Sequence, residues 1–232
     1  EVLLNFGTDT SISIDTVAHE YTHAIERRRS AMIYADESGA IMEALSDIFG
    51  ELVEYYQSKE CDWLHNDGVR DMVDPSKSTE AGYPHPAMYM GENWLDKDNY
   101  SDSTFSHINS TVISHAAYLM SNKGGGTLNM DELAKLWYRA MLMMPSDCDF
   151  GECRALVELA AKSIGFTKKQ LDCIGNAFDA VGIQNTADVD FELSSDATLS
   201  VYDVDLELCG DYIISIAGTR KVLKDGVELK KD

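Results

Sequence analysis

The feature that most constrains the fold is the segment His19–His23, which reads His-Glu-Tyr-Thr-His. Histidines four residues apart lie one turn above each other on the same face of an α-helix. Two imidazoles placed in this way can bind one zinc ion, and the glutamate between them, Glu20, projects beside the metal as a candidate base. We expect this helix to begin at Ser13 or Asp15 and to end at the arginine triplet 27–29, because cations favour a helix C-terminus.

A zinc site with an open position for water needs a third protein ligand, and Glu43 is the candidate. It lies in a second predicted helix, Glu37 to about Tyr56 with Asp36 as its N-cap, whose apolar residues cover much of the circumference. A glutamate usually lies on the surface, but burial of an unpaired carboxylate here would be costly, and a metal would remove that cost. Asp47, one turn further on, is placed to accept a hydrogen bond from a ligand imidazole.

Beyond residue 58 the sequence predicts an irregular stretch, four more helices and a β-rich end. Residues 58–104 contain three prolines and many turn-forming residues, and so long a loop is usually functional or stabilised by ions. Periodicity and capping residues predict helices over residues 108–121, 129–142, 152–164 and 167–181. Alternating β-branched residues predict about four strands after residue 184. We therefore expect a mainly α domain over residues 1–184 and a small β-rich module over residues 185–232.

Composition excludes several classes of partner. The 232 residues are 44% hydrophobic and 25% charged, as in a globular protein, and the net charge of −21 argues against nucleic acid and anionic membranes. No apolar run is long enough to cross a membrane. The chain opens on Glu1-Val2-Leu3-Leu4, so we expect a processed product or a sequence that lacks its true beginning. Five cysteines are too few for a disulfide scaffold, and a disulfide among Cys148, Cys153 and Cys173 is one use left open.

Several longer motifs resemble the thermolysin-like zinc metalloproteases, in the same order along the chain. They are Asp15–Ala24, Ile33–Ala40, Glu43–Gly50, Ser106–Ser110 and Ala177–Gly182. The similarity covers roughly residues 5–184 and implies the helical C-terminal half of that family's catalytic region, with its zincin-type active-site helix.

The resemblance implies a role for each residue that matches the family's motifs. His19, His23 and Glu43 would bind zinc, Asp47 would support a ligand imidazole, and Glu20 would be the general base.

Four further residues match positions that act on the substrate. Tyr34 and His107 match the groups that stabilise the tetrahedral oxyanion, and Asp102 matches the carboxylate that orients that histidine. Arg70 matches the arginine that contacts a substrate carbonyl and lines the S1′ pocket.

Calcium is the second metal that the resemblance implies. Asp15, Glu54, Asp62 and Asp67 match the family's paired calcium site, and clustered carboxylates favour a hard cation. Asp67 stands where the family usually has glutamate, and the short loop from there to Arg70 leaves no room for another of the family's calcium sites. The alternative is a salt-bridged acidic loop.

The family also has a β-rich N-terminal domain, which forms the opposite wall of the cleft. In this chain only residues 1–14 resemble a part of that domain, namely its end. We expect a secreted zinc endopeptidase that cuts protein or peptide substrates before bulky hydrophobic residues, and attachment to a cell surface is left open. An aminopeptidase would need a motif that recognises a free amine. The alternative outside enzymology is a zinc-retaining but inactive fragment or surface-binding protein that lacks the N-terminal lobe.

Overall fold

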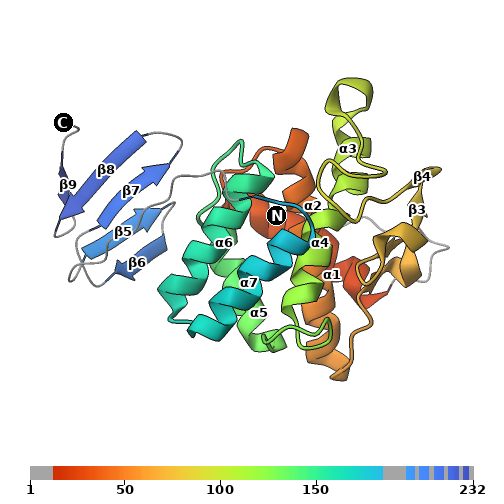
Figure 1. Cartoon of the computed structure of the whole chain (residues 1–232), viewed down its shortest axis with the longest axis horizontal. Helices are drawn as coiled ribbons and strands as arrows, with labels where there is room; N and C mark the ends of the chain where they lie inside the picture. Colours follow the sequence, from red (N-terminus) through yellow and green to blue (C-terminus); the bar gives the residue numbers. More distant parts are fainter. Residues whose placement is uncertain are drawn as a thin grey trace.

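The computed structural model describes residues 13–184, apart from the side chain of Asp67, and the backbones of five strands between residues 197 and 229. The predicted remnant of a preceding β segment falls almost entirely on residues 1–12, outside the described residues. The described part of the chain contains seven α-helices. Figure 1 shows α2 passing through the middle of the helical array. The mainly helical fold that the sequence predicts is confirmed.

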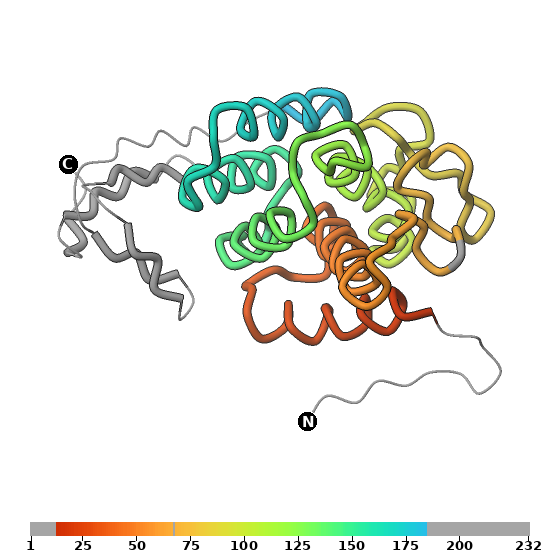
Figure 2. Tube along the Cα trace, turned by 90° about the horizontal axis from the view of Figure 1, so that it is seen from below, coloured from red at the N-terminus to blue at the C-terminus, as the bar shows by residue number. Residues whose placement is uncertain are grey.

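Helices α1 (Ile14–Arg29) and α2 (Asp36–Ser58) pack against each other, and α2 also contacts α3, α4, α5 and α6. Almost every residue of α2 from Ser38 to Leu52 is buried, so this helix forms the centre of the core. The sequence predicts Asp36 as the N-cap of α2, but Asp36 is the first helical residue and Ala35 is the N-cap. Figure 2 shows α1, in red, at one edge of the array, where its outer side is not covered by another helix.

The predicted helix over residues 108–121 is two helices. The first, α3 (Asp102–Asn109), begins earlier than predicted, because the Ser101 side chain accepts a hydrogen bond from the backbone N–H of Thr104. The second, α4 (Thr111–Met120), follows directly. The Ser110 hydroxyl at the junction donates to the carbonyl of His107, and side-chain bonds of this kind compete with helical continuity.

Three further helices complete the core: α5 (Met130–Met141), α6 (Phe150–Ile164) and α7 (Lys168–Ala180). Reciprocal capping boxes begin all three, formed by Asn129 with Glu132, Asp149 with Glu152, and Thr167 with Gln170. The Asp149 box places the start of α6 two residues before the predicted Glu152. The cysteines 148, 153 and 173 have free thiols, so the disulfide left open by the sequence is absent among them.

The stretch between α2 and α3 is irregular, as predicted, and two short antiparallel ladders organise it. Strand β1 (Leu64–His65) pairs with β2 (Arg70–Asp71), and β3 (Thr79–Glu80) pairs with β4 (Tyr83–Pro84). Three 3-10 turns lie at Asn66–Gly68, Pro75–Lys77 and Lys97–Asn99. The register of the first ladder sets His65 opposite Arg70, and both side chains are buried beside the metal candidates.

Five strands follow the helical region, where about four are expected. They are β5 (Ala197–Val201), β6 (Val204–Leu208), β7 (Tyr212–Ile216), β8 (Thr219–Lys224) and β9 (Val227–Leu229). All pairings are antiparallel, in a β5-β6 pair and a β7-β8-β9 sheet. Among the described helices, none combines the length and apolar character that a membrane span requires.

Candidate metal centre

Three side chains from α1 and α2 converge on one point. His19 Nε2 and His23 Nε2 lie 3.2 Å apart, and each lies 3.3 Å from a carboxylate oxygen of Glu43. The helical repeat of α1 brings the two imidazoles to the same face, and the packing of α1 on α2 brings Glu43 to meet them. His19 and Glu43 are buried, and His23 is partly open.

The spacing of these ligand atoms suits a tetrahedral zinc ion. Ligands at about 2.0–2.1 Å from a tetrahedral ion lie roughly 3.3 Å from one another. In addition, Glu43 Oε2 accepts no hydrogen bond from any described residue, although it is buried. Two histidine nitrogens and one carboxylate are also the ligand types that zinc prefers. The residues present therefore fit a zinc ion with an open position.

Each imidazole is oriented by a different buried carboxylate. His19 Nδ1 lies 2.8 Å from Asp47 Oδ1, and His23 Nδ1 lies 2.9 Å from Glu26 Oε2. A carboxylate can only accept, so each Nδ1 carries the proton. When the imidazoles are neutral, each Nε2 therefore has a free lone pair, and the two lone pairs converge. A metal ion stabilises this arrangement.

The electrostatics of the surrounding side chains show how strongly the cluster favours positive charge. Burial opposes protonation of both histidines, but hydrogen bonds to the surrounding carboxylates outweigh it and raise their pKa, that of His23 to about 10. Burial would raise the pKa of Glu43, yet its close contacts with His19 and His23 and the charge of Arg70 hold that pKa well below its usual range. The site thus holds ionised carboxylate ready for a cation.

Asp47 is held in place by Arg70. The guanidinium donates from Nε to Asp47 Oδ2 and from Nη2 to Asp47 Oδ1, both at 2.8 Å, and from Nη1 to Glu80 at 3.1 Å. Asp47 and Arg70 are both buried, and despite the burial of the carboxyl group the arginine charge keeps the pKa of Asp47 far below its usual range. The bidentate pair fixes the carboxylate that in turn fixes His19.

Glu20 and Tyr34 are the two exposed members of the predicted site on the segment 13–35. Glu20 is exposed, and within residues 13–184 no hydrogen bond or ion pair engages its carboxylate. Tyr34 is 38% exposed and its hydroxyl donates to Glu43 Oε1 at 2.6 Å. Burial and the charge of Glu43 raise the pKa of Tyr34, so this hydroxyl keeps its proton and remains a donor.

His107 reaches the same carboxylate from α3, while Asp102 does not reach His107. His107 Nε2 lies 3.3 Å from Glu43 Oε2. Its Nδ1 lies 3.3 Å from the hydroxyl of Ser103, and Asp102, the first residue of α3, is exposed. Among the described contacts of His107, the neighbouring group that could orient the ring is therefore Ser103.

His65 is a residue of the site that the sequence leaves unassigned. Its ring lies 4.6 Å from that of His19, and its Nδ1 lies 3.5 Å from Asp47 and 3.7 Å from Asp15. Burial, assisted by the charge of Arg70, lowers the pKa of His65 to about 4 despite these carboxylates. His65 is therefore a neutral wall of the centre. A histidine in an irregular stretch offers no periodic signal that could reveal this position.

A second acidic cluster lies further along α2. Single oxygens of Glu51, Glu54 and Asp62 lie within 4.8 Å of one another. Glu51 is fully buried, and its Oε1 has no hydrogen-bond partner in the described chain, as is also true of Asp15 Oδ1. Burial and the neighbouring acids raise the pKa of Glu51 to about 9. Glu51 is a member that the sequence analysis missed, and the Asp67 side chain lies outside the described residues.

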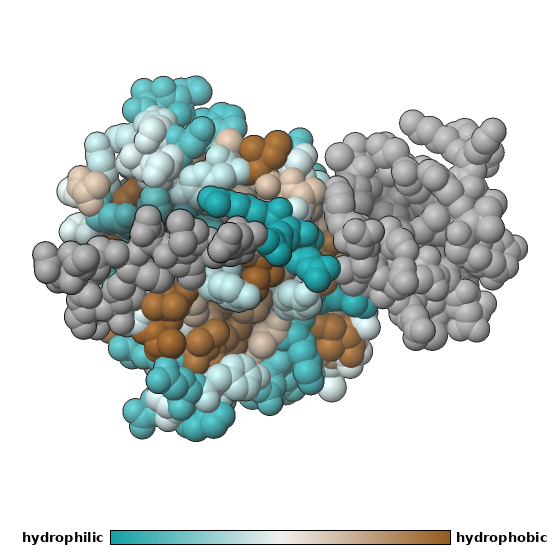
Figure 3. All heavy atoms as spheres, turned by 180° about the vertical axis from the view of Figure 1, so that it is seen from behind, coloured by the Kyte–Doolittle hydropathy of each residue, from teal (hydrophilic) through white to brown (hydrophobic). Residues whose placement is uncertain are grey.

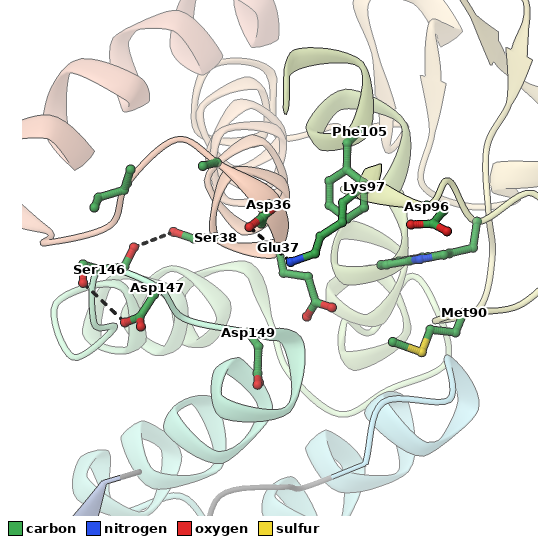
Figure 4. A pocket seen from close by; sticks show the side chains of 13 residues that line it. Asp36, Glu37, Ser38, Met90, Asp96, Lys97, Phe105, Ser146, Asp147 and Asp149 are labelled. Atoms are coloured by element: carbon green, nitrogen blue, oxygen red, sulfur yellow. Dashed lines mark hydrogen bonds and ion pairs between the residues drawn. The ribbon is translucent and has the colours of Figure 1, made fainter. Parts of the chain in front are cut away.

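A pocket of about 630 Å³ lies beside the segment that carries Tyr34. Figure 4 shows Phe105 and Met90 on its wall and Asp36, Asp96, Asp147 and Asp149 around it, with Lys97 directed toward Asp36. The lining includes Ile33 and Ala35, the chain neighbours of Tyr34, but no candidate zinc ligand. The metal centre and this pocket are separate sites.

Comparison with known proteins shows the same helical domain elsewhere. Residues 30–183 match the family model described as the thermolysin metallopeptidase α-helical domain. Thermostable neutral protease NprT of Geobacillus stearothermophilus and thermolysin of Alicyclobacillus acidocaldarius are each 36% identical over 188 residues, 73% of this chain and 33% of theirs. The solved precursor of protealysin from Serratia proteamaculans is 25% identical, with a TM-score of 0.64 over 74% of this chain and 58% of that one. The chain thus spans about a third of the length of these curated relatives.

Proposed function

Because this chain belongs to the thermolysin family of metallopeptidases, we propose that its metal centre binds a catalytic zinc ion and hydrolyses internal peptide bonds. The observation that carries the proposal is the convergence of His19, His23 and Glu43 at tetrahedral spacing. Glu20 follows His19 on the same helix, is exposed, and has no partner for its carboxylate among the described residues. The spacing suits zinc, and the free carboxylate supplies a base.

Each residue then has a part in the reaction. A bound zinc ion would polarise the substrate carbonyl and make water acidic enough to react near neutral pH. Glu20 takes a proton from the attacking water and delivers it to the leaving amine. Tyr34 and His107, whose donor atoms already face the metal side of Glu43, stabilise the oxyanion that develops on the carbonyl oxygen.

Recognition of the substrate is a further part of the proposal. Arg70 anchors Asp47 and lies at the edge of the site, and its contact with a substrate carbonyl is inferred from the matching family position. Preference for a bulky hydrophobic residue after the cut, and orientation of His107 by Asp102, rest on the same resemblance. For Asp102 to orient the His107 ring, it would have to move to that ring, because the hydroxyl at His107 Nδ1 in this structure is that of Ser103.

We also propose that calcium occupies the acidic cluster of Glu51, Glu54 and Asp62, with Asp15 and Asp67 as further candidate ligands. A buried carboxylate with an unpartnered oxygen is costly, and a hard cation with oxygen ligands removes that cost. The unpartnered oxygens of Glu51, Glu54 and Asp15 support this proposal. The alternative is protonation of Glu51, whose raised pKa allows it to remain neutral in the absence of a cation.

The setting of the site suggests an incomplete cleft. The outer side of α1 carries Glu20 and Tyr21, both exposed, and Ile33 is exposed beside it. Figure 3 shows hydrophobic side chains, in brown, among the hydrophilic ones on the side of the molecule where α1 lies. We propose that an N-terminal β-rich lobe covers this side in the complete protein, that the protein acts outside the cell, and that residues 185–232 form a separate module.

Casein cleavage by the full chain, with and without a zinc chelator, tests the proposed activity. Chelator-sensitive cleavage is expected. In Glu20→Ala, zinc should remain bound at one ion per chain while cleavage is lost, since the base is removed and the ligands are not. The second candidate function is a zinc-retaining, inactive fragment, which the open side of α1 favours. Stoichiometric zinc without chelator-sensitive cleavage in the unaltered chain would select that alternative.

A further inference from the structure

Glu26 is a buried carboxylate that the proposed reaction does not use. It lies on α1 three residues after His23 and is completely buried. Its neighbours in sequence, Arg27, Arg28 and Arg29, are exposed and do not pair with it. A buried carboxylate without a partner is strongly unfavourable, so the contacts of Glu26 should explain its presence.

The described contacts of Glu26 lead to the metal centre. Its Oε2 lies 2.9 Å from His23 Nδ1, which is the hydrogen-bond partner that the described residues give this carboxylate. Its Oε1 accepts no hydrogen bond from any described residue. The carboxylate therefore depends on the imidazole of His23 for the hydrogen-bond donor that compensates its burial.

Glu26 contacts His23 in the same way as Asp47 contacts His19, the other candidate zinc ligand on α1. Asp47 accepts from His19 Nδ1 at 2.8 Å and is itself fixed by Arg70. Glu26 accepts from His23 Nδ1, with the hydroxyl of Ser46 at 3.2 Å from the same nitrogen. A carboxylate on Nδ1 fixes the proton there, leaves Nε2 with its lone pair, and stops rotation of the ring.

From this geometry we propose that Glu26 is a positioning residue of the metal centre, which holds His23 in the tautomer and orientation that direct Nε2 at the metal. The inference rests on the proposed zinc function. Without Glu26, the Ser46 hydroxyl, which already lies 3.2 Å from Nδ1, could donate to that nitrogen. The ring would then carry its proton on Nε2, and the ligand would be lost for part of the time. Removal of such a partner typically weakens metal binding by about 10–100-fold.

The test compares zinc affinity in variants of the full chain by competition with a chromophoric zinc chelator. Glu26→Leu should bind zinc about 10–100-fold more weakly. Glu26→Gln should lie between Leu and the unaltered chain, because its amide oxygen can still accept from Nδ1. Glu37→Gln is the matched control, since Glu37 is also a helical carboxylate shielded in part from solvent but bonds to Tyr89 and the Phe150 backbone instead of a histidine. It should bind zinc as the unaltered chain does.

A second measurement separates positioning from a merely structural role. Long-range nitrogen–proton NMR spectra of the histidine rings compare the zinc-free unaltered chain with zinc-free Glu26→Leu at a pH where the rings are neutral. His23 should be protonated at Nδ1 in the unaltered chain, with an additional Nε2-protonated form in the variant. Zinc affinity of Glu26→Leu within twofold of the unaltered chain, with an unchanged tautomer, would overturn the proposal even if the variant were less stable. Failure of the unaltered chain to bind zinc would instead overturn the proposed function itself.

Discussion

Removal of the charge on Asp47 should destabilise the protein as well as weaken its metal site. Asp47 is wholly buried and accepts three hydrogen bonds at 2.8 Å, two from Arg70 and one from His19. In Asp47→Asn one oxygen becomes an amide donor that faces another donor. The carboxylates that remain near the Arg70 guanidinium are then Glu80, at 3.1 Å and with a side chain that is 27% exposed, and Glu43, at 3.8 Å.

The size of the effect follows from this loss of one partner of a buried ion pair. Such a loss costs about 3–5 kcal/mol of unfolding free energy. For a domain of this size each kcal/mol lowers the melting temperature by about 2–4 °C, so the expected fall is roughly 6–20 °C. Replacement of both partners, Asp47→Asn with Arg70→Met, leaves no buried unpaired charge at this point. The double variant should therefore lose less stability than the sum of the two single variants.

Chemical unfolding followed by helical circular dichroism, with a zinc chelator present, measures this contribution without the metal. Because the folded-state pKa of Asp47 is depressed, its contribution is fully present above the unfolded pKa of about 4 and disappears as the pH falls below that value. The difference between Asp47→Asn and the unaltered chain should shrink over the same range. A difference below 1 kcal/mol at neutral pH, or strict additivity in the double variant, would refute the assigned ion pair.

Two further predictions concern the substrate side and the acidic cluster. Tyr34→Phe and His107→Ala should each lower kcat/KM by about 10²–10³-fold, as loss of an oxyanion donor does, with zinc content unchanged; a change confined to KM would instead indicate uniform substrate binding. Calcium should raise the melting temperature of the unaltered chain, and Glu51→Gln should reduce that increase, because a fully buried ligand oxygen is lost. An equal calcium effect in both proteins would contradict the proposed membership of Glu51 in the calcium site.

The zinc ligands could be predicted because two of them share a helical spacing and the third is a charged residue in an apolar segment. His19 and His23 share a helix face by spacing alone, and Glu43 is conspicuous as a carboxylate among apolar residues. The structure brings these three together as the sequence predicts. The three capping boxes begin helices within two residues of the predicted positions, because capping is local chemistry.

The remaining parts of the centre depend on tertiary packing. Glu26 precedes three arginines and reads as part of a charged helix end, yet the packing of α1 on α2 buries it completely. Glu51 could have been recognised by the argument used for Glu43, since it also lies among apolar residues of α2. His65 gave no such signal, because only the ladder of β1 with β2 sets its place beside His19. The division of α3 from α4 was missed because the apolar period continues across Ser110.

The central claim is that His19, His23 and Glu43 hold one zinc ion. Anomalous diffraction above and below the zinc absorption edge, from crystals of the unaltered chain grown with zinc, locates the metal directly. The account predicts one dominant peak at about 2.0–2.1 Å from His19 Nε2, His23 Nε2 and a Glu43 oxygen, with a fourth position facing Glu20. A dominant peak at Glu51, Glu54 and Asp62, or no zinc peak between the two histidines, would contradict it.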